Sequence, residues 1–89
     1  MDAVVRQMRD ALIDNDLKLL AAINARITLA ARLDTYTRQH GRKAVEQVPD
    51  DWMHLYIQLA NQGPLSDEGL RDLYGHLLEI TRREVSPED

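Results

Sequence analysis

The chain has 89 residues, a net charge of −4 and no cysteine. This length predicts one domain over residues 1–89 with a small core. The acidic balance argues against a general nucleic-acid binder, and the lack of cysteine excludes disulfides and thiolate metal sites. No apolar run approaches the roughly 18 residues of a membrane span, and no signal-peptide core is present. We therefore expect a cytoplasmic protein that does not bind membranes.

The first predicted element is a helix from about residue 3 to residue 39. Glycine and proline are absent from residues 1–40, and Gly41 is a plausible stop. Apolar side chains recur at steps of three and four, which is typical of one helix face. They are Val5, Met8, Leu12, Leu19, Ile23, Ile27, Ala30 and Leu33.

Two shorter helices are predicted after it. Pro49 suits the first turn of the second helix, and Asp50 follows at its positive end. The pair Gly63-Pro64 breaks that helix, and Ser66 is a good N-cap for a third one that frays near Pro87. No alternating β pattern occurs, so the expected fold is all-α with one long, one short and one medium helix.

One chain is too small to cover such a first helix. About 37 residues in a helix extend roughly 55 Å. A second apolar row that includes Ile13, Leu17 and Leu20 lies beside the first. An apolar surface of that size needs a partner, so we expect a homodimer. The alternative is a monomeric three-helix bundle in which the first helix is interrupted.

Three charged residues interrupt the apolar stripe: Arg9, Asp16 and Arg26. A buried guanidinium without a partner is costly. Arg9 and Arg26 lie about 25 Å apart along one helix, so they cannot hold one small molecule within a chain. Two copies that pair antiparallel and cross near residues 17–18 would place Arg9 of one beside Arg26 of the other, in two sites suited to a carboxylate. The alternative is that these arginines pair with aspartates of their own helix.

The segment "MRDALIDNDLKLLAAINARITLA" resembles the opening helix of the all-helical chorismate mutases. The segment "HGRKAVEQVPDDWMHLYIQLANQGPLSDEGLRDLYGHLLEITRREV" resembles the rest of that family, most closely an actinobacterial-like branch. The resemblance implies an intertwined homodimer of three-helix protomers. It also implies an isomerase of the shikimate pathway and aromatic amino acid biosynthesis, which rearranges chorismate to prephenate without a cofactor.

The resemblance also implies site residues. Catalysis in this family is positional and electrostatic, with cations on two carboxylates and donors at the breaking ether oxygen. Arg9 from the partner chain and Arg26 match the family's substrate-binding arginines, Thr81 its hydroxyl position and Glu46 the acid near the substrate hydroxyl. The implied substrate-binding set also includes Asp50, at the position of a family glutamate. The ether-oxygen donor falls near Glu84, which serves when protonated.

Two positions depart from the family. Thr37 stands where the family has a catalytic lysine, and Pro49 stands where it has an arginine. Arg38 is a candidate to replace the lysine in catalysis, and Arg42 a candidate to bind substrate. A step of one residue turns a helical side chain by about 100°, so Arg38 would need a changed register or a long reach. The alternative is that these cations lie in solvent and complement the helix dipole.

The three histidines, His40, His54 and His76, show no metal spacing, and we predict no metal site. Three functions remain open. The first is an isomerase acting on chorismate or on its 4-amino analogue, which an acid-rich site would favour. The second is a non-catalytic dimer that binds a metabolite or a shikimate-pathway enzyme. The third is a helical oligomerisation module whose arginines pair internally.

Overall fold

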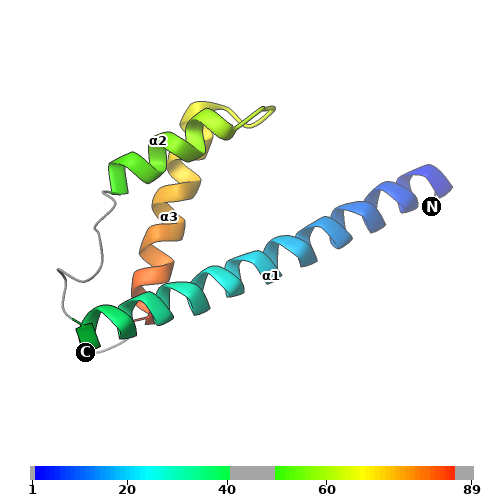
Figure 1. Ribbon diagram of the computed structural model, residues 1–89. Helices are drawn as coiled ribbons and strands as arrows, with labels where there is room; N and C mark the ends of the chain where they lie inside the picture. The colour runs from blue at the N-terminus through cyan, green and yellow to red at the C-terminus, as the bar shows by residue number, and fades with distance from the viewer. Residues whose placement is uncertain (1, 41–49, 86–89) are drawn as a thin grey trace.

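The computed structural model describes residues 2–40 and 50–85 (Figure 1). They form three helices: α1 over Ala3–His40, α2 over Asp50–Ala60 and α3 over Asp67–Val85. These two ranges contain no strand, which confirms the predicted all-α class for them. Within the same ranges, none of the helices has the length and apolar character needed to cross a membrane.

Helix α1 runs without interruption for 38 residues, as the absence of glycine and proline allows. Its first turn is capped by Asp2, whose Oδ1 accepts a hydrogen bond of 2.8 Å from the Val4 backbone N–H. Arg38 and His40 lie in its last turn, where positive charge complements the helix dipole. The predicted stop at Gly41 lies outside the described residues.

Helix α3 begins where its sequence predicts. The Ser66 Oγ accepts a hydrogen bond of 3.0 Å from the Gly69 backbone N–H, which confirms Ser66 as the N-cap. The preceding turn is held by Asn61, whose Nδ2 donates to the Leu65 carbonyl at 2.8 Å. Gly63 has a φ of 76°, a conformation that glycine adopts without strain. The expected fraying near Pro87 falls outside the described residues.

Helix α3 holds the fold together. It packs on the C-terminal half of α1 at one end and on α2 at the other, while the described residues of α2 make no packing contact with α1. Figure 1 shows the N-terminal half of α1 projecting away from α2 and α3. The buried residues of the described chain are Leu70, Tyr74 and Thr81, which are 7–8% exposed and all belong to α3.

The molecule is more extended than a compact protein of its size. Its radius of gyration is 17.0 Å, against about 12 Å for a compact chain of this length. Its accessible surface is 7694 Å², against roughly 5,300 Å² for a compact monomer. No residue of α1 is buried. The exposed large apolar residues of its N-terminal half are Val4, Val5, Met8, Leu12, Ile13, Leu17, Leu19 and Leu20.

Candidate functional site

A guanidinium and a hydroxyl meet where α1 and α3 pack. Arg26 of α1 donates a hydrogen bond from Nη1 to the Oγ1 of Thr81 on α3, with a length of 2.7 Å. Thr81 is 8% exposed and Arg26 is half-buried, so the contact is largely shielded from water. The two residues stand 55 positions apart in sequence. The fold thus brings together two of the residues that the sequence predicts for substrate binding.

Two aromatic rings extend this contact towards α2. The guanidinium carbon of Arg26 lies 5.8 Å from the centroid of the Tyr74 ring, within the range of a cation–π interaction. The ring of His54, from α2, stacks on Tyr74 with centroids 5.6 Å apart and planes 12° from parallel. We call Arg26, Thr81, Tyr74 and His54 the Arg26 cluster.

The Nε2 atom of His54 is buried and has no hydrogen-bond partner in the structure. Buried polar atoms are usually paired, so the unpaired ring nitrogen of His54 is an unusual feature. The sequence indicated His54 only as an ordinary histidine. The spacing of Tyr74 and Thr81, seven residues apart on one helix face, was a signal for Tyr74. No sequence signal joined His54 to Tyr74, because that contact crosses two helices.

The charge on Arg26 has no acidic counterpart in the part of the chain that the structure describes. The ion pairs there join Lys18 to Asp14 at 3.5 Å and Arg38 to Asp34 at 3.1 Å. The expected alternative, an arginine paired with an aspartate of its own helix, therefore does not describe Arg26. Its partners are the neutral hydroxyl of Thr81 and the face of Tyr74. A half-buried cation with neutral partners is suited to receive an anion.

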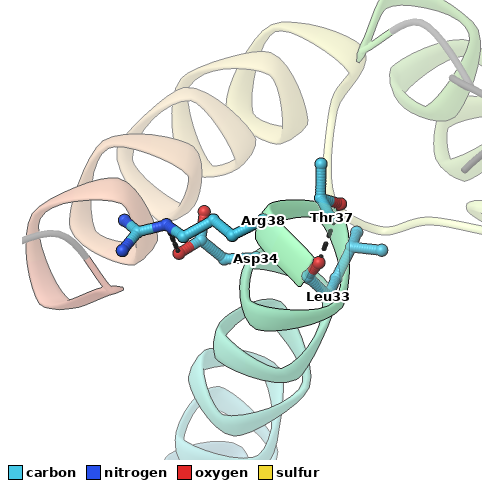
Figure 2. A network of polar contacts seen from close by, with 4 residues as sticks. All are labelled: Leu33, Asp34, Thr37 and Arg38. Carbon is cyan, nitrogen blue, oxygen red and sulfur yellow. Dashed lines mark hydrogen bonds and ion pairs between the residues drawn. The ribbon is translucent and has the colours of Figure 1, made fainter. Parts of the chain in front are cut away.

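Thr37 and Arg38 occupy the last turns of α1 (Figure 2). The Thr37 Oγ1 donates to the Leu33 carbonyl of its own helix at 2.8 Å. Figure 2 shows Asp34 and Arg38 extending from one side of the helix and Leu33 and Thr37 from another. Arg38 is exposed and its Nε is paired with Asp34. Its catalytic role stays a prediction, and its side chain leaves the helix in a different direction from Thr37, as the helical rotation requires.

Arg9 is exposed on the N-terminal half of α1. Seventeen residues of helix separate it from Arg26, or about 25 Å. Glu84 is exposed near the end of α3, one turn beyond Thr81. Asp50 is the first residue of α2. The remaining predicted positions lie outside the described residues: Arg42, Glu46 and Pro49.

An open hollow runs along a neighbouring face of α1. It is lined by Ile27, Thr28, Ala31, Arg32, Thr35, Tyr36 and Gln39. Neither Arg26 nor Thr81 lines this hollow, so it does not include the Arg26 cluster. The cluster itself is a partly shielded set of contacts among three helices. Its geometry, and not a deep cavity, makes it the candidate site.

No family model, no curated protein and no solved structure gives a significant match to the chain.

Proposed function

We propose that the chain is a chorismate mutase-type isomerase that rearranges chorismate, or its 4-amino analogue, without a cofactor. The observation that carries the proposal is the hydrogen bond between Arg26 and Thr81. Both residues match substrate-binding positions of the family that the sequence resembles. Their side chains meet across two helices, and Arg26 carries a charge without an acidic counterpart among the described residues.

The proposed enzyme is an intertwined homodimer of protomers with helices of 38, 11 and 19 residues. Its first support is the uncovered apolar face of α1, together with about 2,400 Å² of accessible surface beyond that of a compact monomer. An obligate dimer commonly buries that much surface. Antiparallel pairing of two α1 helices, crossing near residues 17–18, would set Arg9 of the partner beside Arg26.

In this dimer the two arginines would bind the two carboxylates of the substrate, one from each chain. Charge-assisted hydrogen bonds from guanidinium groups to carboxylates are strong and directional. They would hold the substrate in the compact conformer in which its reacting carbons approach each other. The rearrangement is unimolecular, so this positioning supplies much of the acceleration. Thr81 would add a hydroxyl next to Arg26.

The donor at the breaking ether oxygen is the weak part of the proposed site. Thr37 carries no charge, and its hydroxyl hydrogen is bonded to the Leu33 carbonyl. Loss of one preorganised donor of this kind typically slows a reaction by about 10²- to 10³-fold. Arg38 is the proposed replacement for the lysine in catalysis, and Glu84 and Glu46 are the other proposed catalytic residues. Arg42 and Asp50 are the proposed further contacts to substrate. The enzyme is therefore expected to be slow.

A direct assay tests the proposal. Purified protein is incubated with chorismate, and separately with its 4-amino analogue, and the loss of substrate and formation of product are followed by chromatography. The Arg26→Ala variant is the control. It removes the half-buried central cation, and alanine favours the helical conformation of α1. Turnover of either substrate above the uncatalysed rate, abolished in the variant, supports the proposal. Equal rates of substrate loss with the parent chain and with Arg26→Ala would refute the proposal.

A second candidate function is a non-catalytic dimer that binds a dicarboxylate metabolite or partners a shikimate-pathway enzyme. The engaged hydroxyl of Thr37 and the ion pair of Arg38 with Asp34 favour it, because neither leaves a cation at the family's lysine position. Calorimetry with a bicyclic ether dicarboxylate that mimics the transition state separates the two functions. Binding of the mimic without turnover would support the second candidate.

A further inference from the structure

The Arg26 cluster is built as a series of contacts that begins on α2. His54 stacks on Tyr74, Tyr74 faces the Arg26 guanidinium, and Arg26 donates to Thr81. Tyr74 and Thr81 are both 8% exposed, so neither side chain has free space in which to turn. Arg26 therefore contacts two buried residues of α3, Thr81 and Tyr74. Tyr74 in turn packs against His54 of α2.

The ring of His54 supports Tyr74 through its flat surface. The two planes lie only 12° from parallel, and stacked rings at 5.6 Å interact through their faces. The buried Nε2 makes no hydrogen bond. The side chain therefore contributes to this contact through the face of its ring, and Nε2 adds no hydrogen bond.

Helix α2 reaches the Arg26 site only through α3 in the described chain, because its described residues pack on α3 and not on α1. The His54–Tyr74 stack is a ring contact along this route. We propose that His54 is a positioning residue for the anion site: its ring fixes the Tyr74 ring, which in turn fixes the direction of the Arg26 guanidinium. This inference rests on the proposed function for the identity of the ligand, but not for the geometry.

The test compares three variants of the full chain. His54→Leu removes the ring, and His54→Phe keeps the ring and removes the nitrogens. His76→Leu is the matched control, because His76 is an exposed histidine on α3. The first readout is the side-chain Nε–Hε signal of Arg26 in the NMR spectrum, assigned by its disappearance in Arg26→Lys. The ring current of Tyr74 changes the chemical shift of this signal only while the guanidinium lies over the ring.

We expect the Arg26 signal to move towards its free position in His54→Leu and to stay in place in His54→Phe and His76→Leu. The second readout is the dissociation constant of the bicyclic ether dicarboxylate. We expect it to rise about tenfold in His54→Leu, the upper range for a lost aromatic pair. It should change less than twofold in His54→Phe. Circular dichroism checks that each variant keeps its helical content.

Two results would overturn the inference. One is an Arg26 signal that is the same in folded His54→Leu as in the parent chain. The other is a displaced signal or a tenfold loss of affinity in His54→Phe, which would assign the effect to a ring nitrogen. His54→Phe keeps the inference open to refutation even if His54→Leu does not fold, because a displaced signal in His54→Phe contradicts it. If no protein binds the dicarboxylate, the proposed function fails while the NMR comparison still tests the positioning role.

Discussion

A charge placed on the uncovered face of α1 should separate two copies of the chain. Leu12 is 63% exposed in the protomer, so substitution by glutamate costs the isolated protomer little stability. In the proposed dimer this residue lies against the partner's α1. Leu12→Glu would then remove apolar contact and bury a carboxylate among apolar neighbours.

The size of the effect follows from the exposure of Leu12. Burial of a whole leucine side chain contributes about 1.5–3 kcal/mol, and some two-thirds of it remains to be gained in the protomer. Each copy therefore loses about 1–2 kcal/mol, and symmetry doubles the loss to about 2–4 kcal/mol. The dissociation constant of the dimer should rise by roughly 30- to 1,000-fold, before the cost of the buried charge is added.

Sedimentation equilibrium over a range of micromolar concentrations measures this change. Gln7→Glu is the matched control, because Gln7 is an exposed residue on the opposite side of the same part of α1. It adds the same charge and should leave the dimer intact. A monomeric parent chain would refute the reasoning. So would equal dissociation constants for Leu12→Glu and Gln7→Glu.

Three further changes test the site and the fold. Thr81→Val removes the acceptor of the Arg26 hydrogen bond, and we expect a loss of about 1–2 kcal/mol, seen as a fall of roughly 5–15 °C in Tm. Ser66→Ala removes the N-cap of α3 and should cost about 1 kcal/mol in urea denaturation, while Ser66→Asp should retain stability. Thr37→Lys combined with Pro49→Arg should raise kcat/KM for chorismate by about 10²-fold or more.

Each of these changes also has a result that contradicts its premise. An unchanged Tm for Thr81→Val would mean that the hydrogen bond to Arg26 contributes nothing to stability. Equal denaturation of Ser66→Ala and the parent chain would remove the capping argument. No gain from the double substitution at Thr37 and Pro49, in a protein that still binds the dicarboxylate, would mean that these positions do not form part of the reacting site.

Local signals predicted the helices well. The absence of glycine and proline before Gly41 predicted an uninterrupted α1, and the side chain of Ser66 predicted where α3 begins. Both depend on neighbours in sequence, so the sequence alone is sufficient. The cap at Asp2 was not predicted, although an aspartate two residues before a helical N–H is a common N-cap signal.

The candidate site was predictable only in part. Arg26 and Thr81 were predicted from a resemblance, and their contact depends on how α3 packs on α1. The stack of His54 on Tyr74 could not be predicted, because no periodicity in α2 indicates which turn of α3 it meets. Contacts between helices are set by packing of whole faces, and single-sequence patterns give the faces but not their register.

The small number of buried side chains has a consequence in the cell. The described protomer has three buried residues, all on α3, and none of them is fully buried, so little burial opposes the entropy of the unfolded chain. If association supplies the rest, the folded fraction obeys mass action and increases with the number of copies expressed. The quantity of this protein that a cell makes would then set not only how much of it is present but how much of it has a structure.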